Sequence, residues 1–516
     1  MKELQEECDQ ATDATNFPFG EVFDAYYDLK MKCHAVRETN RYHRQFLAKA
    51  EEQGVRVSKH DKEKWKDLTV DEYDRYISTL LLLCLVAPGF SYRDCWDKNS
   101  SRRNADVQYA FPLARFRQIS KFLHFADNDH IDKEDKLYKI RHLHKRFSEN
   151  LRTAHCALAP YLSFDEFVAA CLSRCSFTVY MPLKRHPRGI RFYAVVDSSR
   201  LTLNLHVDTL EKFPEVHPEF GAIENLTVGV LKPFLNMGFQ VTLDQGFGSP
   251  TLLTWLHGNQ TPACATMRKD RAGVPEQLKW GEHTYAKNAA GTKWVRGKFK
   301  AERKPIDFLD TYQSGDLTVL SWQCKINKFL TFGTTIDNVE LGAFEINRKF
   351  RHGKWRKIFV PKPKCIAEYY NTKMAGIDLV DQTNAYIGCR MRFNRWPSRV
   401  NSVYIQLAVC QVKALYAHYC PNATKVSKTA PRVLQEIVNQ KLGLNLGAHR
   451  QSVEHGIHAI TPDVPPIRNC MKHRCWIAGC RVRTLFYCPE CLEKDRDNWT
   501  FCGPHFNRSH ISQYSL

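Results

Sequence analysis

Four aspartates in the middle and later parts of the sequence are of the residue type that divalent cations prefer. Asp165 ends the segment YLSFD and Asp244 ends FQVTLD, so each follows a short apolar stretch typical of a β-strand. Asp378 and Asp381 are three residues apart, which on a helix places both carboxylates on one face, where a cation would offset their repulsion. Taken one at a time, these aspartates fit a strand-end turn or an ordinary acidic helix face better than a site.

A second group of metal-binding residue types lies near the C-terminal end of the sequence. Its members are Cys470, His473, Cys475, Cys480, Cys488, Cys491, Cys502, His505 and His510. Two of the pairs have the C-x2-C and C-x2-H spacings of a zinc knuckle, and thiolate with imidazole suits tetrahedral Zn²⁺. So short a segment buries too little apolar surface to fold alone, and bound zinc would supply its folding free energy. These candidates outnumber the ligands of two four-coordinate sites, and their spacing leaves open which one is spare.

Basic residues gather in two later segments. Residues 348–364 read RKFRHGKWRKIFVPKPK and contain no acid, and residues 390–399 read RMRFNRWPSR. Clustered cations bind nucleic acid by releasing its condensed counterions. The residues that we expect to contact DNA are Arg348, Lys349, Arg351, Lys354, Arg356, Lys357, Arg390 and Arg392. A solvated basic face is the alternative interpretation of the same charges.

The composition also favours a polyanionic partner. The 516 residues include 75 Lys and Arg against 55 Asp and Glu, a formal net charge of +20, which indicates nucleic acid first. Hydrophobic residues make up 43%, which excludes wholesale disorder. The longest apolar run, 80–87, is too short to cross a bilayer, so we expect no membrane partner. The acidic N-terminus is not a secretory signal, and the 19 cysteines therefore point to reduced thiols or metal ligands.

The aspartates need a sheet to position them. Strands are predicted at 161–165, 190–196, 201–207, 239–244 and 263–267, and helices at 224–236 and 250–257. This β-β-β-α-β-α-β order predicts an α/β layer arrangement with a central sheet. The sequence from 21 to 159 looks helical, residues 273–360 predict short strands, and a long helix is predicted at 396–419.

Eight stretches spread over nearly the whole chain carry more specific patterns. In order they are TNRY (39–42), YRDCW (92–96), ARFRQISKFLHFADND (114–129), LSFDE (162–166), MPLKRHPRGIRFYAVVDSS (181–199), TLDQGFGSPTLL (242–253), TMRKDRAGVPEQL (266–278) and YYNTKMAGIDLVDQ (369–382). Together they resemble the piggyBac-type transposases and the proteins derived from them. The last stretch is the most specific of these matches.

The resemblance implies a fold class. It is an α/β ribonuclease-H-like catalytic core interrupted by a β-rich insertion, with a helical dimerisation and DNA-binding domain and a C-terminal cysteine-rich zinc domain that binds transposon ends. The implied ranges are a flexible acidic tail (1–20), the helical domain (21–159 and 387–460), the catalytic domain (160–272 and 361–386), the insertion (273–360) and the zinc domain (470–516).

The resemblance also implies an activity. Asp165, Asp244 and Asp378 would form a catalytic triad holding Mg²⁺ or Mn²⁺, and Asp381 would support it. Two such ions roughly 3.5–4 Å apart can activate a nucleophile and stabilise a leaving oxygen. The implied function is cut-and-paste DNA transposition by phosphodiester hydrolysis and transesterification. The implied partners are double-stranded DNA, as transposon ends and target, and a second copy of the chain, in the nucleus.

Two other interpretations stay open. The sequence departs from the family pattern at Ser173-Arg174, where Gly-Arg is usual, and at Gln245-Gly246 after the second aspartate. These departures bear on end-specific DNA binding and full transposition more than on metal binding. A domesticated DNA-binding protein without catalytic activity is the second interpretation. The cysteine-rich tail also fits a RING-like or PHD-like module that binds other proteins.

Overall fold

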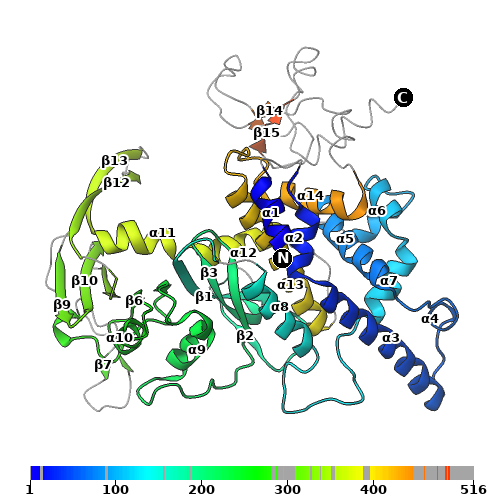
Figure 1. Cartoon of the computed structure of the whole chain (residues 1–516), viewed down its shortest axis with the longest axis horizontal. Helices are drawn as coiled ribbons and strands as arrows, with labels where there is room; N and C mark the ends of the chain where they lie inside the picture. The colour runs from blue at the N-terminus through cyan, green and yellow to red at the C-terminus, as the bar shows by residue number, and fades with distance from the viewer. Residues whose placement is uncertain are drawn as a thin grey trace. The chain divides into compact units, whose positions relative to one another are not determined.

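Helices form both ends of the larger part of the chain, and a mixed sheet lies between them in the sequence (Figure 1). The computed structural model describes residues 2–11, 16–87, 91–154, 157–182, 184, 187–279, 286–287, 294–295, 308–325, 328–336, 339–349, 355–387, 395–444, 458–459, 473–474, 483–484 and 486–487. The chain divides into two units, 1–442 and 443–516. Within the described residues, no helix has the length and hydropathy that crossing a membrane requires.

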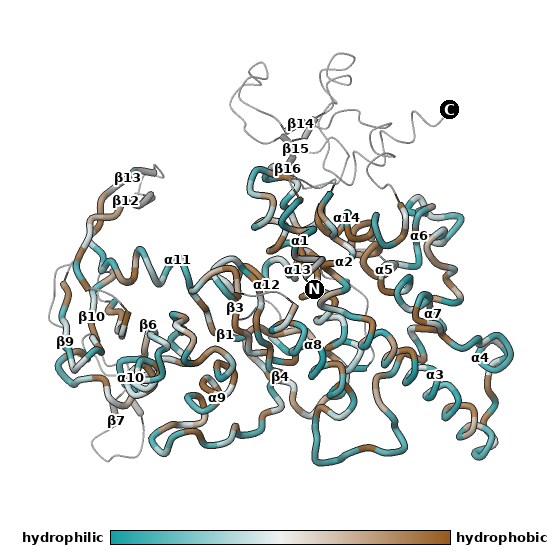
Figure 2. Tube along the Cα trace, viewed as in Figure 1, coloured by the Kyte–Doolittle hydropathy of each residue, from teal (hydrophilic) through white to brown (hydrophobic). Residues whose placement is uncertain are grey.

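The first part of the larger unit is helical, as the sequence predicts. Its helices are α1 (Lys2–Gln10), α2 (Phe19–Tyr26), α3 (Leu29–Glu52), α4 (Lys59–Lys62), α5 (Val70–Val86), α6 (Ala105–Ala110), α7 (Leu113–Phe122) and α8 (Arg141–Thr153), with a 3-10 turn η1 (Tyr92–Cys95). Hydrophobic stretches, brown in Figure 2, run through this region around α5. Leu80, Leu81, Leu82 and Leu83 of α5 are buried, as is Phe116 of α7.

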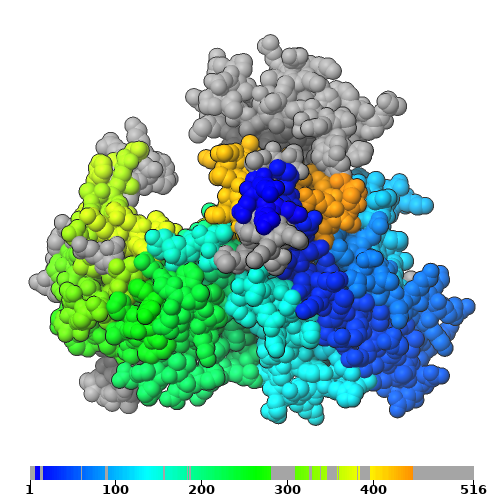
Figure 3. All heavy atoms as spheres, viewed as in Figure 1, coloured from blue at the N-terminus to red at the C-terminus, as the bar shows by residue number. Residues whose placement is uncertain are grey.

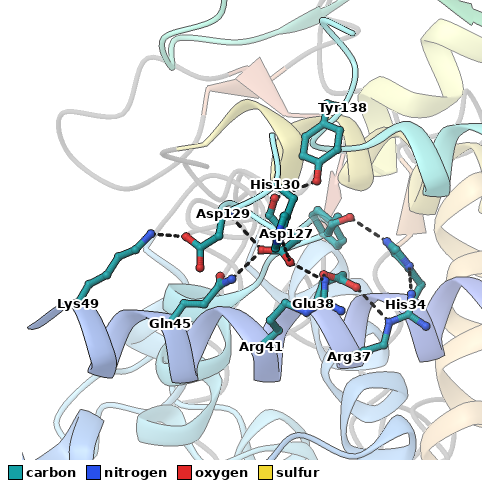
Figure 4. A network of polar contacts seen from close by, with 11 residues as sticks. His34, Arg37, Glu38, Arg41, Gln45, Lys49, Asp127, Asp129, His130 and Tyr138 are labelled. Atoms are coloured by element: carbon teal, nitrogen blue, oxygen red, sulfur yellow. Dashed lines mark hydrogen bonds and ion pairs between the residues drawn. The ribbon is translucent and has the colours of Figure 1, made fainter. Parts of the chain in front are cut away.

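Polar contacts fix the connection between α7 and α8 to helix α3 (Figure 4). Asp127 accepts hydrogen bonds from Gln45 Nε2 at 2.6 Å and from Arg41 Nη1 at 3.3 Å. Its own segment contributes the backbone N–H of Asp129, and the Tyr138 hydroxyl donates to the Asp127 carbonyl. The N–H of Asp129 and then Gln45 lower the pKa of Asp127 to about 2, because these donors favour the ionised carboxylate.

A nine-stranded sheet follows the helices. Its strands are β1 (Tyr161–Ala170), β2 (Thr178–Tyr180), β3 (Arg188–Asp197), β4 (Thr202–Val207), β5 (Gln240–Leu243), β6 (Ala263–Met267), β9 (Leu309–Ser314), β10 (Leu317–Lys325) and β11 (Lys328–Thr334). The order is β2-β3-β1-β5-β6-β11-β10-β9, and β4 also pairs with β3. β1, β5 and β6 run parallel, and the other pairings are antiparallel.

Two helices join the parallel strands. α9 (Ala222–Leu231), extended by the 3-10 turn η2 (Lys232–Phe234), precedes β5, and α10 (Pro250–Gly258) connects β5 to β6. α9 packs on β3 and β4, whereas α10 packs on β6, β10 and β11. The strand predicted at 263–267 has those bounds in the structure. The central α/β layer is therefore the predicted one.

Residues 273–360 are rich in β-structure, and the structure shows where their strands go. After η3 (Glu276–Leu278) come the short pair β7 (Ala286–Lys287) and β8 (Trp294–Val295), and then β9, β10 and β11. β11 pairs with β6, so β9–β11 continue the central sheet. β12 (Leu341–Lys349) and β13 (Trp355–Pro363) pair only with each other among the described strands and form a two-stranded ribbon.

The last helices of the unit return to the first ones. They are the π-helical segment η4 (Cys365–Tyr370), α11 (Asn371–Lys373), α12 (Gly376–Ile387), α13 (Trp396–Tyr419) and α14 (Ala430–Leu442). The long predicted helix 396–419 is confirmed as α13, and most of its side chains are buried. The Tyr27 hydroxyl of α2's C-terminal cap donates to Asn401 Oδ1 of α13 at 2.7 Å. The helical part is thus built from two distant stretches of sequence.

The prediction of a flexible tail over residues 1–20 is wrong for its described part. Residues 2–10 form α1, and Phe17 is fully buried with its ring 5.2 Å from that of Tyr416. The backbone N–H of Gly20 donates to Gln440 Oε1 of α14 at 2.7 Å. Figure 3 shows the blue N-terminal residues beside the orange residues of α14. Burial of the aromatic side chains orders this segment, although its acidic composition predicts flexibility.

Candidate active site

Asp165 and Asp244 lie at the same level of two neighbouring parallel strands. The last residues that pair between β1 and β5 are Phe164 and Leu243, and the two aspartates come next in each strand direction. β5 ends there, and Asp244 begins a turn in which its carbonyl accepts from two backbone N–H groups. The backbone positions of the two aspartates are therefore neighbours across the β1–β5 pair.

The sequence predicted that Asp165 ends its strand, and this is wrong. β1 continues to Ala170 because β3 pairs with it along nine residues. Asp165 is consequently 9% exposed, whereas Asp244 is exposed at the end of β5. The parallel pairing of β1 with β5 stops just before Asp165, because β5 ends there, although β1 itself continues. Asp165 therefore lies at the edge of the parallel part of the sheet.

Helix α12 carries the third aspartate and begins in direct contact with the sheet. A Cβ atom on Gly376 would lie 2.6 Å from Ser163 Oγ and 3.4 Å from the carbonyl oxygen of Asp197. Ser163 and Asp165 share a face of β1 because side chains alternate along a strand. Asp378 follows two residues after Gly376 in the first turn of α12, and its side chain is exposed. α12 thus starts on the face that carries Asp165.

Asp244 is oriented by two residues from other elements. The Thr266 hydroxyl of β6 donates to Asp244 Oδ1 at 3.2 Å and lies 3.1 Å from the Tyr370 hydroxyl. Burial raises the pKa of Tyr370, and the carboxylates of Asp244 and Asp165 add to the shift. The tyrosine therefore stays protonated beside the aspartates.

Asp165 is a carboxyl group that resists ionisation. Burial, followed by repulsion from Glu166, raises its pKa to about 8, although the Glu166 backbone N–H donates to Asp165 Oδ1 at 2.8 Å. A nearby cation would reverse this shift because it favours the ionised form. Lys184 already acts in this direction, but its charge offsets only part of the rise in the pKa of Asp165, and its Nζ lies 3.0 Å from Glu166 Oε1.

The aspartates do not form a ready-made metal cage. In the part of the chain that the structure describes, no three His, Cys, Asp or Glu side chains are grouped so that they could hold a metal ion. Asp381 lies in α12, and its side chain is outside the described residues. The donor set is of the right kind, since carboxylates from a strand, a strand end and a helix are the hard oxygen ligands that Mg²⁺ prefers. Binding would require Asp165, Asp244 and Asp378 to draw closer together.

The β12–β13 ribbon carries half of the residues predicted to bind DNA. Arg348 lies opposite Arg356, and Lys349 lies opposite Trp355. Lys357 is exposed and forms an ion pair with Glu345 at 3.1 Å. The other candidates, Arg351, Lys354, Arg390 and Arg392, lie outside the described residues.

The basic stretch 390–399 is not uniformly available to DNA. Arg395 Nη2 donates to the carbonyls of Ser120 and Lys121, at 3.1 and 2.7 Å. Arg399 Nε donates to the carbonyl of Ala170 at 2.9 Å. These two arginines satisfy backbone acceptors at the end of α7 and of β1, so their contacts are structural.

The predicted zinc ligands cannot be placed. Cys470, Cys475, Cys480, Cys488, Cys491, Cys502, His505 and His510 lie outside the described residues. His473 belongs by its backbone to β15 (His473–Arg474), which pairs with β16 (Arg483–Thr484). Elsewhere in this unit β14 (His458–Ala459) pairs with β17 (Phe486–Tyr487). Zinc binding stays a prediction.

Sequence reasoning missed several neighbours of the aspartates. Glu166, Lys184, Thr266 and Tyr370 all lie within the stretches that carried the family resemblance, yet none was given a role. Glu166 could have been noticed because it directly follows Asp165. The other three approach the site only through strand pairing and the return of η4 to the sheet.

Comparison with known proteins identifies the family. A family model described as Transposase IS4 matches residues 21–410. The human (Homo sapiens) PiggyBac transposable element-derived protein 2 is 28% identical over 424 residues. The chain belongs to the piggyBac-type transposase family. The match spans 78% of this chain and 62% of the human relative, so this family member covers less than two thirds of that protein's length.

The fold comparison agrees with the family. A cryo-EM structure of a piggyBac transposase synaptic complex with hairpin DNA superimposes with a TM-score of 0.64 at 18% identity. The alignment covers 89% of this chain and 84% of the other. The mixed sheet and the helices around it therefore have the piggyBac transposase fold.

Proposed function

We propose that this member of the piggyBac-type family cuts and joins DNA strands with divalent metal ions held by Asp165, Asp244 and Asp378, with Asp381 in support. The main support is the register of β1 and β5, which sets Asp165 and Asp244 side by side. The contact of Gly376 with Ser163 starts the Asp378 helix on the same face of the sheet. Three carboxylates from separate elements are a donor set suited to Mg²⁺ or Mn²⁺.

The catalytic core in this proposal is ribonuclease-H-like. Antiparallel β4, β3 and β1 continue into parallel β5 and β6, with helices in the crossovers. β9–β11 then form an insertion that extends the same sheet before the chain returns with Asp378. This arrangement lets residues far apart in sequence supply one site.

The chemistry divides between the ions and the chain. Bound divalent ions would lower the pKa of an attacking water and stabilise charge on the phosphodiester oxygens. Asp165 would give up its proton as it becomes a ligand, since its raised pKa keeps much of it neutral otherwise. Thr266 would hold the Asp244 carboxylate in one orientation. Exposure of Asp244 and Asp378 leaves the site accessible to a DNA backbone.

A strand-nicking assay with Mg²⁺ tests this function. Asp244→Asn keeps the size and removes the charge, and cleavage should fall by at least a hundredfold while DNA binding is retained. Asp316→Asn, at an exposed aspartate between β9 and β10, is the matched control and should cleave like the wild type. Equal cleavage by Asp244→Asn and wild type would rule out the proposed metal ligands.

A second candidate function is a domesticated, non-catalytic DNA-binding protein. The human relative, whose name describes a transposable element-derived protein, is as consistent with this function as with strand cleavage. The same assay separates the two functions, because this candidate binds DNA and leaves it intact with every divalent ion.

The partners follow from the proposed function. DNA would bind through the cations of the β12–β13 ribbon and those at 390–392, and two copies of the chain would handle two DNA ends in the nucleus. The cysteines and histidines from Cys470 to His510 would hold Zn²⁺, which atomic emission on the purified full chain can quantify. Analytical ultracentrifugation tests the dimer, and imaging of a tagged full chain tests the nuclear location.

A further inference from the structure

Lys184 is a partly buried cation at the edge of the candidate site. Its Nζ lies 3.0 Å from Glu166 Oε1 and donates to the Glu166 carbonyl at 3.3 Å. The Lys184 side chain is 35% exposed and that of Glu166 is 17% exposed. An ion pair with this little exposure is screened less than a surface pair.

Glu166 links this lysine to the first aspartate. Its backbone N–H donates to Asp165 Oδ1 at 2.8 Å, while its carboxylate pairs with Lys184. Burial lowers the pKa of Lys184, but Glu166, Asp165 and Asp378 more than offset this, so its pKa lies above the ordinary value. The ammonium group therefore feels the field of three carboxylates from β1 and α12.

A divalent ion and this ammonium group would compete for attraction to the same carboxylates. Neighbouring positive charges repel each other strongly where water is partly excluded. The lysine has a flexible four-carbon stem and a solvent-exposed portion, so its head can swing away from Glu166. A DNA phosphate, which must approach the same carboxylates, is a ready alternative partner.

We propose that Lys184 is a positioning residue that balances the carboxylate charge without divalent ions and moves to a DNA phosphate when ions bind. The inference rests on the proposed function, because it takes the aspartates as metal ligands. The Lys184 side chain would thus both oppose the entry of divalent ions and contact the DNA substrate.

The first test measures Mn²⁺ binding by electron paramagnetic resonance. It uses the zinc-loaded full chain without DNA. Lys184→Gln should bind Mn²⁺ about three- to tenfold more tightly than wild type, because a competing positive charge is gone. Lys184→Arg keeps the charge and should resemble wild type. Lys121→Gln, which removes a lysine paired with Asp61 in the helical part, is the matched control and should also resemble wild type.

Salt-dependent binding to a random-sequence DNA duplex is the second test. With Ca²⁺ present, Lys184→Gln should lower the slope of log K against log salt by about one phosphate contact, and in buffer without added Ca²⁺ the slope should not change. A lysine that only supports the fold would weaken Mn²⁺ and DNA binding together.

The outcomes keep this inference separate from the proposed function. If Asp244→Asn binds Mn²⁺ as wild type does, the proposed metal ligands are wrong. If Asp244→Asn loses Mn²⁺ but Lys184→Gln binds it no more tightly than wild type, the aspartate site stands and the role of Lys184 is overturned. An unchanged salt slope with Ca²⁺ would likewise overturn the phosphate contact.

Discussion

Gly376 meets Ser163 with no room for a side chain between helix α12 and strand β1. Ser163 Oγ donates to the Val196 carbonyl at 3.1 Å, so it cannot turn away from a new Cβ atom without losing that bond. The glycine therefore sets how closely the helix that carries Asp378 approaches the strand that carries Asp165.

Gly376→Ala should loosen this contact. We expect a loss of about 1–2 kcal/mol in the free energy of unfolding from overpacking, and a tenfold or greater loss of strand cleavage because Asp378 shifts. Gly258→Ala is the control, since a Cβ atom there meets nothing within 4 Å. Adding Ser163→Ala to Gly376→Ala should recover part of the stability, and a double variant no better than the single one would contradict the contact.

The ionisation of Asp165 predicts a pH-dependent stability when no Mg²⁺ or Mn²⁺ is added. Its pKa is raised from an ordinary 3.8 to about 8, so the folded state holds the proton more tightly than the unfolded state. That stabilisation is fully present below the unfolded pKa and is lost as the pH rises through the folded pKa. Asp165→Asn cannot ionise, so in urea titrations its advantage over wild type should be small near pH 4 and largest near pH 8. A variant less stable than wild type at about pH 8 would refute this assignment.

Arg395, at the start of α13, should affect stability and not DNA binding. Arg395 donates to two terminal carbonyls of α7, and its charge suits the C-terminal end of a helix. Arg395→Met should cost about 2–3 kcal/mol in urea titrations and leave the salt dependence of DNA binding unchanged. Lys357→Met, at an exposed site on the ribbon, should change stability by no more than about 0.5 kcal/mol and reduce the salt slope.

Four buried or half-buried charges hold α14 against the first helices. Lys32 and Lys441 are each contacted by both Asp24 and Asp74, at N–O distances from 2.6 to 3.0 Å. Both lysine side chains are nearly inaccessible to water, at 6% and 5% exposure. Removing one lysine leaves an uncompensated carboxylate in this network.

Lys441→Met should therefore cost about 3 kcal/mol in the free energy of unfolding. The double variant Lys441→Met with Asp24→Asn restores charge balance and should recover part of that loss, which a double-mutant cycle measures. Lys425→Met, at an exposed lysine before α14, is the control and should stay within about 0.5 kcal/mol of wild type. A loss from Lys441→Met as small as the control's would show that the network contributes little.

Much of the fold was predictable because it depends on local patterns. Continuous apolar residues gave the buried strand Ala263–Met267, and spacings of three and four residues gave the helix Trp396–Tyr419. Asp244 was correctly placed at a strand end because a turn follows it directly. The family of the chain was also readable from its motifs.

The errors came from contacts between distant segments. The segment YLSFD predicts a strand that ends at Asp165, whereas pairing with β3 extends the strand to Ala170. The excess of acids over bases predicts a flexible N-terminal segment, whereas Phe17 is buried against Tyr416. No local pattern shows that Gly376 must touch Ser163, or that Lys184 returns to Glu166.

The hydrogen bond from Gly20 to Gln440 joins residues 420 positions apart, and that from Tyr27 to Asn401 joins residues 374 positions apart. During synthesis, α2 and α3 leave the ribosome long before α13 and α14 exist to cover their apolar faces. The nascent N-terminal helices must wait with exposed hydrophobic surface, which makes them candidates for chaperone capture. A message truncated anywhere before α14 should accordingly yield an aggregating or rapidly degraded product rather than a stable helical fragment.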